Sequence, residues 1–238
     1  MDIESESRFA RALGVARQAS IITGSILLAL ALESFWGGLM DRRAEAQALT
    51  ALRTEFLETR VEVLRARGVH GERCDAATAL RGMFQVPEAD VDVDALAVLT
   101  KEMASITSVN APNGVLTGMI SSGRLSLIRD DDLRAALAGW PQRLADHRES
   151  EDYVLAVIRE QWVPWLTENT VLTDTWGRPG AVAESSYDRA LLARVLGDQQ
   201  FRNLVMGHDY TCTFVLRDSE NLERDVDAIL EALVARRR

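Results

Sequence analysis

The most apolar stretch of the chain is SIITGSILLALALESFWGGLM, which runs from Ser20 to Met40 and lies almost at the N-terminus. Extended by Ala19 to residues 19–40, it would form a helix about 33 Å long at 1.5 Å per residue. The hydrocarbon core of a bilayer is about 30 Å thick. The length therefore predicts a transmembrane helix over residues 19–40, preceded by an N-terminal tail over residues 1–18.

The C-terminal flank of this segment has the residues expected at a membrane surface. Trp36 lies near the end of the segment, and Arg42 and Arg43 follow it directly. Aromatic and basic side chains are common at the headgroup level, so we predict that Trp36, Arg42 and Arg43 lie at the membrane interface.

Two other kinds of segment share some of these features. A cleaved signal peptide would have its basic region in the arginines before the stretch and its cleavage site at Ala29–Ala31, but the apolar run continues past that point. A helix of a soluble core would have polar residues along one face, and none occurs before Glu33. A membrane span is therefore the favoured interpretation.

Glu33 is the one charged residue inside this segment. A carboxylate within a bilayer is costly and often marks a functional position. Its place near Trp36 would let it reach the headgroups or pair with Arg42 or Arg43, which favours a structural role. Helix association or ion handling is the alternative.

The residues after Met40 follow helical spacing almost everywhere, so we predict an all-α fold in which the span continues into an antiparallel helical bundle over residues 41–238. An apolar stripe begins with Leu49, Leu52 and Phe56. It could form a coiled-coil seam, in which case these residues and Glu33 would associate helices of different chains. The stripe is shorter than four heptads, which favours one helix of an intramolecular bundle, and Gly68 and Gly71 are expected to end it.

Local signals predict the later helix boundaries. We expect a helix over Val93–Thr107, a C-terminal cap at Gly123, N-terminal caps at Asp130 and Asp198, interruptions at Pro141 and Pro164, a long loop over Thr167–Ser186 and a short helix over Tyr187–Leu196.

The charge of the chain excludes one class of partner. The formal net charge is −9, which repels the phosphates of nucleic acids. Cys74 and Cys212 have no CxxC spacing, which makes a zinc site of cysteines improbable. A disulfide would require an oxidising compartment, so two buried free thiols are favoured.

No catalytic signature is present in the sequence. The three histidines, His70, His147 and His208, are isolated, so a metal site could be assembled only by folding. The acidic run from His147 to Asp152 is typical of a charged helix face. We therefore expect no catalytic, cofactor or metal site, and no enzymatic activity.

Two stretches, GSILLALALESFWGGLMDRRAEAQALTALRTEFLETRVEVL and LTGMISSGRLSLIRDDDLRAALAGW, resemble a family of bacterial single-span membrane proteins of unknown function. The first resembles their span followed by a charged helix, and the second resembles an internal turn with a leucine–arginine helix. The resemblance implies a helical domain behind an N-terminal anchor and provides no catalytic or binding residues.

These patterns predict a membrane-anchored, non-enzymatic protein whose partners are the lipid bilayer and either further copies of itself or a larger membrane complex. A membrane sensor that binds a small molecule within the bundle is the alternative. Arginines flank the span equally on both sides, so charge does not decide its orientation. Because the tail before the span is short, we expect a single-pass protein of the bacterial inner membrane with its bundle in the periplasm.

Overall fold

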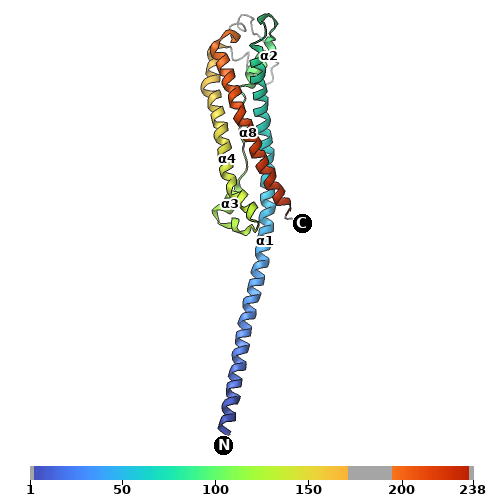
Figure 1. The fold of residues 1–238 in the computed structure, drawn as a ribbon, viewed down its shortest axis with the longest axis vertical. Coiled ribbons are helices and arrows are strands. Elements are labelled where there is room, and N and C mark those ends of the chain that lie inside the picture. The colour runs from blue at the N-terminus through green and yellow to red at the C-terminus, as the bar shows by residue number, and fades with distance from the viewer. Residues whose placement is uncertain (1–2, 171–194, 236–238) are drawn as a thin grey trace. The chain divides into compact units, whose positions relative to one another are not determined.

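The computed structural model of the chain describes residues 3–170 and 195–235, and this part contains helices and no strands. The predicted all-α class is confirmed. The α-helices are α1 (Ile3–Met83), α2 (Val93–Glu102), α3 (Gly114–Ser121), α4 (Asp131–Val157), α5 (Val163–Asn169) and α8 (Gln199–Ala235), as Figure 1 shows. Two 3-10 turns, η1 (Glu88–Asp90) and η2 (Arg124–Leu127), and a π-helical turn, η3 (Ile158–Trp162), connect them.

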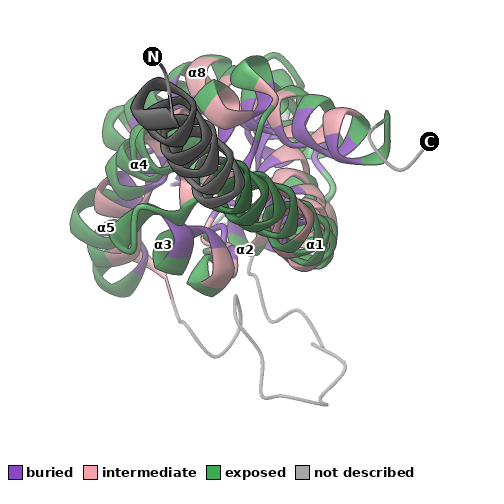
Figure 2. Ribbon diagram, turned by 90° about the horizontal axis from the view of Figure 1, so that it is seen from below, coloured by how far each residue is buried: buried purple, intermediate pink, exposed green. Residues whose placement is uncertain are grey.

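The chain divides into two compact units, Met1–Thr50 and Ala51–Arg238. The first unit consists of the N-terminal part of α1, where the side chains of residues 3–23 and 26 lie outside the description. Figure 2 shows the ribbon of this part as largely exposed. Seven of its large apolar side chains are between 56% and 68% exposed: Leu27, Leu28, Leu30, Leu32, Phe35, Trp36 and Met40. At 3.6 residues per turn these positions lie on every side of the helix, whereas Leu39 and Leu49 are partly buried. Among the described residues, no helix has a stretch long and apolar enough to cross a membrane.

The second unit is built from three long helices: the part of α1 from Ala51, α4 and α8. Helices α1 and α8 are antiparallel, because residues further along α1 contact residues that come earlier in α8. The pairs are Arg60 with Asp227, Arg67 with Glu223, Cys74 with Cys212 and Arg81 with Asp209. The contacts of α4 with α8 follow the same rule: Arg143 with Asp225, Ser150 with Asp218 and Tyr153 with Phe214. Helices α1 and α4 therefore run parallel to each other, and α8 runs antiparallel to both.

An extended segment, 105–113, makes this arrangement possible. It carries the chain from the end of α2 back along α1, where Arg65 donates to the Thr107 hydroxyl at 2.9 Å and to the Ser108 carbonyl at 2.8 Å. At its far end, the buried Glu55 carboxylate accepts the backbone N–H groups of Val115 and Leu116 at the start of α3. The return between the two parallel helices is thus an extended strap.

Helix α1 does not end where the sequence indicated. It passes through Gly68 and Gly71 without interruption and reaches Met83. A glycine within a helix costs about 1 kcal/mol relative to alanine. The buried side chains on both sides of the glycines, which include Val63, Ala66 and Leu80, provide packing that outweighs this cost.

Other boundaries agree with the sequence in part. The caps at Gly123, which has a φ of 71°, and at Asp130 and Asp198 are confirmed. Helix α2 ends at Glu102, so the prediction that it continues to Thr107 was wrong: a turn over residues 103–104 follows, and the extended strap begins at residue 105. Pro141 lies within α4, whereas Pro164 follows the π-helical turn at the start of α5. The loop expected over Thr167–Ser186 starts later than predicted, because α5 continues to Asn169. Residues 171–194, which hold the rest of that loop and most of the helix expected over Tyr187–Leu196, lie outside the described residues, and residues 195 and 196 are helical.

The two cysteines are joined. A disulfide links Cys74 on α1 to Cys212 on α8, with a Cα–Cα distance of 5.6 Å. The interpretation as free thiols was wrong, because the antiparallel packing of helices far apart in the sequence brings the two side chains together.

Candidate functional site

The largest concentration of buried polar groups lies in the middle of the second unit. His70 comes from α1, while His147 and Glu151 come from α4. The spacing of four residues places His147 and Glu151 on one face of α4, turned toward α1. The three side chains are only 1%, 3% and 4% exposed, respectively.

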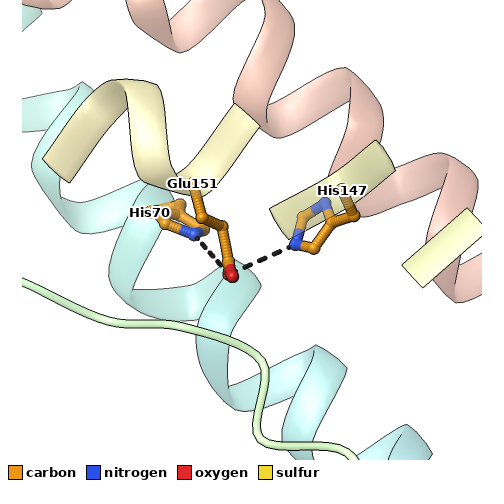
Figure 3. Close-up of side chains that lie close together, drawn as sticks. All are labelled: His70, His147 and Glu151. Carbon is orange, nitrogen blue, oxygen red and sulfur yellow. Dashed lines mark hydrogen bonds and ion pairs between the residues drawn. The ribbon is translucent and has the colours of Figure 1, made fainter. Parts of the chain in front are cut away.

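One carboxylate oxygen is the meeting point of the cluster (Figure 3). Oε1 of Glu151 lies 3.3 Å from Nε2 of His70 and 3.2 Å from Nε2 of His147. The contact with His147 lacks hydrogen-bond geometry, and neither ring nitrogen of His147 has a hydrogen-bond partner. The backbone N–H of Val109, in the extended strap, donates to both carboxylate oxygens at 3.0 and 3.1 Å.

The Glu151 carboxylate is ionised despite its burial. Burial alone raises the pKa of this group, but the interactions with His147 and His70 and the Val109 N–H outweigh that effect and lower the pKa to about 2. The pKa of His70 is lowered, chiefly by burial. The site at neutral pH therefore contains an anionic oxygen beside the uncharged ring of His70.

A buried arginine adjoins the cluster. Arg73 is 1% exposed and lies one turn after His70 on α1. Burial lowers its pKa to about 10, against the opposing attraction of Glu151, so the guanidinium is charged at neutral pH. Its Nε and Nη2 atoms have no hydrogen-bond partner. Arg73 thus balances the charge of Glu151 and has hydrogen-bond donors that no described residue accepts.

The third histidine is separate from the cluster. His208 on α8 is fully buried, and its ring lies edge-on to that of Trp162 at a centroid distance of 5.3 Å. Burial, with a smaller contribution from Arg73, lowers its pKa to about 3. His208 is therefore a neutral core side chain.

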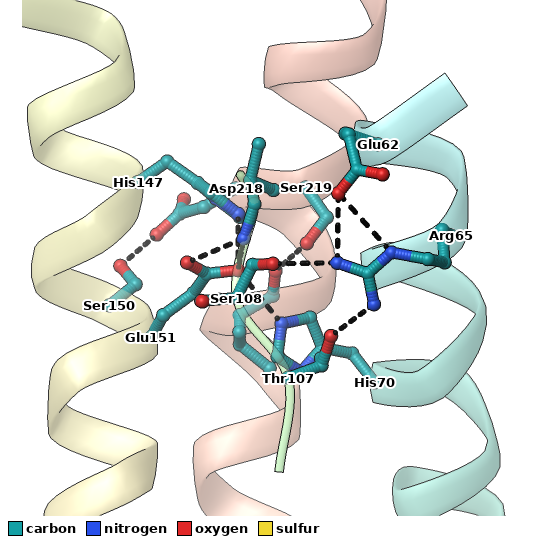
Figure 4. Close-up of polar contacts among 12 residues, drawn as sticks. Glu62, Arg65, His70, Thr107, Ser108, His147, Ser150, Glu151, Asp218 and Ser219 are labelled. Atoms are coloured by element: carbon teal, nitrogen blue, oxygen red, sulfur yellow. Dashed lines mark hydrogen bonds and ion pairs between the residues drawn. The ribbon is translucent and has the colours of Figure 1, made fainter. Parts of the chain in front are cut away.

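Polar contacts enclose the cluster (Figure 4). On one side, Arg65 of α1, which pairs with Glu62, donates to the strap, and on the other Ser150 of α4 donates to Asp218 of α8 at 2.7 Å. A surface pocket of about 250 Å³ opens between α4 and α8. His147 lines this pocket and also belongs to the cluster, so it connects the buried site with the surface.

The residues selected from the sequence lie elsewhere. Leu52 and Phe56 are buried inside the second unit, where Phe56 packs edge-on against Trp140 at 5.3 Å, so the stripe serves an intramolecular bundle. Leu49 is partly buried in the first unit. Glu33 and the expected interface residues Trp36, Arg42 and Arg43 are exposed on α1.

Sequence reasoning missed the cluster because its members are far apart in the chain. The run from His147 to Asp152 was expected to be a charged helix face, and this was wrong for His147 and Glu151, which are buried. The spacing of four residues between His147 and Glu151 could have indicated that both lie on one face of a helix. Nothing local indicated that His70 would join them.

The cluster has the donor set of a metal site. His70, His147 and Glu151 each offer one ligand atom, and these atoms all lie within 4.8 Å of one another. Two imidazole nitrogens and a carboxylate oxygen are ligands that Zn²⁺ and related transition-metal ions accept.

Comparisons of the chain with protein-family models, with curated proteins and with solved structures found no match.

Proposed function

We propose that this chain is a membrane-anchored, non-enzymatic helical protein, held by residues 19–40, whose bundle assembles with further copies or with a larger membrane complex. The observation that carries the proposal is the exposure of large apolar side chains on every side of α1 between Leu27 and Met40. Exposed apolar area of this extent is unfavourable in water, and a bilayer would cover it from all directions. Residues 19–40 have the length of a single span in the sequence, and this range includes residues 19–23 and 26, whose side chains lie outside the description.

The disulfide supports a particular side of the membrane for the bundle. Disulfides persist in oxidising compartments and are rare in the cytosol. The bond between Cys74 and Cys212 therefore supports a bundle on the oxidising side, which in bacteria is the periplasm.

Extraction tests the anchor. Membranes that contain the full chain are washed with alkaline carbonate, and we expect the protein to stay in the pellet. A variant with Leu28→Arg and Leu30→Arg should appear in the supernatant, because arginine near the centre of a span costs about 3 kcal/mol per residue. The matched variant Leu57→Arg and Val61→Arg changes exposed apolar residues of the second unit and should stay in the pellet. Release of the unaltered protein by carbonate would refute the anchor.

Glu33 provides a test of assembly. A carboxyl group in an apolar helix can hydrogen-bond to a partner helix, and glutamine can replace it in that role. We expect an oligomer in mild detergent, measured by native mass spectrometry, that Glu33→Leu dissociates and Glu33→Gln retains. A monomeric full chain would contradict assembly with itself, and a monomer that co-purifies with no partner subunit would contradict the proposed assembly in both forms.

A second candidate function is a membrane sensor that binds a ligand inside the bundle. The buried cluster favours it, because His147 and Arg73 have polar atoms without hydrogen-bond partners. Such a function predicts a ligand-dependent rise in the Tm of the full chain.

A further inference from the structure

We propose that His70, His147 and Glu151 form a binding site for a divalent transition-metal ion such as Zn²⁺. This inference names the ligand class of the sensor function proposed above and rests on that function for its biological meaning. The chemistry of the site itself is independent of the membrane anchor.

The geometry of the cluster suits tetrahedral coordination. Zn²⁺ binds imidazole nitrogen and carboxylate oxygen at about 2.0–2.2 Å, which places neighbouring ligand atoms of a tetrahedron about 3.3–3.6 Å apart. The two distances from Oε1 of Glu151, 3.3 Å to His70 and 3.2 Å to His147, match that separation. An ion could enter between the three atoms with small movements of the side chains.

The state of His147 is the independent observation that points to a ligand. This imidazole is 3% exposed, it is directed toward Glu151, and both of its nitrogens have no hydrogen-bond partner (Figure 3). A buried polar atom without a partner costs about 1–3 kcal/mol. Nε2 of His147 lies 3.2 Å from Oε1 of Glu151 without hydrogen-bond geometry, and a metal ion between these two atoms would give both of them a ligand contact.

The pocket on the surface provides access for a small cation. His147 lines it together with three carboxylates, Asp146, Asp218 and Asp225, and one guanidinium, Arg143, which gives the lining a net charge of −2. A concave surface of one sign raises the local concentration of the opposite ion. Its volume of about 250 Å³ is below the range of about 300–1,000 Å³ typical of organic ligands. The pocket therefore fits an ion better than an organic molecule.

A bound cation would add positive charge beside the Arg73 guanidinium, which already balances Glu151, so an accompanying anion would have to offset the charge of the metal. Three protein ligands leave a fourth position of a tetrahedral ion for water or a small anion. The guanidinium of Arg73 interacts electrostatically with Glu151 and has two buried nitrogen atoms, Nε and Nη2, without hydrogen-bond partners. These donors suit an anion that accompanies the metal.

The surroundings indicate that the ion would exchange. Ligating histidines usually donate their second ring nitrogen to an acceptor, and losing such a partner lowers metal affinity about 10–100-fold. Nδ1 of His70 and Nδ1 of His147 have no hydrogen-bond partner. We therefore expect reversible binding, which suits a sensor better than a permanent structural metal.

The test is a calorimetric titration of the full chain in mild detergent. The protein is first stripped with a chelator and then titrated with Zn²⁺, and we expect one ion per chain. Co²⁺ should bind at the same site and give the visible absorption bands of tetrahedral Co²⁺, while excess Ca²⁺ should displace neither ion.

Matched variants identify the ligands. His147→Leu and Glu151→Gln should each lower the affinity for Zn²⁺ by about tenfold or more. His208→Leu removes a buried histidine outside the cluster and should change the affinity less than twofold. Circular dichroism of each variant shows whether the helices are retained, and the cobalt spectrum of a folded His147→Leu protein should lose its tetrahedral bands.

Three results would overturn the metal site: absence of stoichiometric Zn²⁺ binding, binding that His147→Leu leaves unchanged, or an equal loss of binding in His208→Leu. The fate of the membrane anchor is read separately. A protein that binds Zn²⁺ through the cluster but is released by carbonate would support the metal site and refute the anchor.

Discussion

Single residues in this protein show how burial and charge act together. Glu151 keeps an ionised carboxylate in the interior because two histidines and a backbone N–H surround it, and burial alone would have raised its pKa. His208 has no compensating partner, and its pKa falls to about 3. Glu151 is therefore charged and His208 neutral in the same bundle, because only Glu151 has partners that offset the effect of burial.

His208 should make the fold sensitive to acid. Its pKa is about 6.5 in an unfolded chain and about 3 in the folded one, so between these values the unfolded state binds the extra proton. Stability attributable to His208 is thus present above pH 6.5 and lost as the pH falls toward 3. Between pH 6.5 and 5 the loss is on the order of 2 kcal/mol, since one pKa unit corresponds to about 1.4 kcal/mol.

The measurement is urea unfolding of the full chain in mild detergent at pH 7 and pH 5. We expect His208→Leu to lose less stability between the two values than the unaltered protein, because leucine cannot titrate. Arg73, the charged group that lowers this pKa together with burial, is unchanged in both proteins. An identical pH dependence of the two proteins would contradict this interpretation.

Glu55 should be important for the start of α3. Its buried carboxylate accepts the N–H groups of Val115 and Leu116 at 2.6 and 3.0 Å. Glu55→Ala would leave both donors without this partner, and we expect a loss of about 2 kcal/mol in the free energy of unfolding. Glu58→Ala, at an exposed position on the same helix, should change it by less than about 0.5 kcal/mol. Equal effects of the two variants in urea unfolding would rule out this capping role.

At the scale of elements, α1 and α8 are held together at regular intervals. Arg60, Arg67, Cys74 and Arg81 follow one another every seven residues on α1, and each contacts α8. Seven residues are nearly two helical turns, so these side chains form one stripe. The surface ion pairs of this stripe contribute little individually, and the covalent bond is its strongest member.

Removing the disulfide should destabilise the bundle. The two cysteines are 138 positions apart, and linking distant positions restricts the unfolded chain strongly. We expect Cys74→Ala with Cys212→Ala to lower the free energy of unfolding by about 2–5 kcal/mol. A reducing agent should destabilise the unaltered protein similarly and leave the double variant unaffected. Unchanged stability of the double variant would show that the bond does not contribute.

The elements also show what the sequence could predict. The caps at Gly123, Asp130 and Asp198 were predictable, because each depends on residues within one helical turn. The passage of α1 through Gly68 and Gly71 was not, because packing against distant helices decides it. The extended strap, in which Val109 and Ala111 are buried, has no helical periodicity that would reveal it.

The candidate site was predictable only in part for the same reason. The spacing of His147 and Glu151 places them on one face of a helix whatever the fold. The third member, His70, is 81 positions from Glu151 and joins them only because α1 and α4 pack in parallel. The same dependence on tertiary packing applies to the disulfide.

The whole molecule combines a bundle with a buried polar centre and a helix whose apolar side chains are exposed. The central claim is that residues 19–40 anchor the chain in a membrane while the bundle lies on the oxidising side. The compartment is reported by Cys74 and Cys212, which are disulfide-bonded in the structure. The anchor is reported by the membrane fraction in which the protein is found.

The most direct test is a gel-shift assay with a maleimide polymer on the carbonate-washed membrane fraction of cells that produce the full chain. Free thiols are alkylated at the moment of lysis, so only cysteines in disulfides can react after reduction. We predict that the protein is found in this fraction, unshifted before reduction, and shifted by two labels after it. Protein absent from the fraction, or thiols already blocked by alkylation at lysis, would contradict the claim.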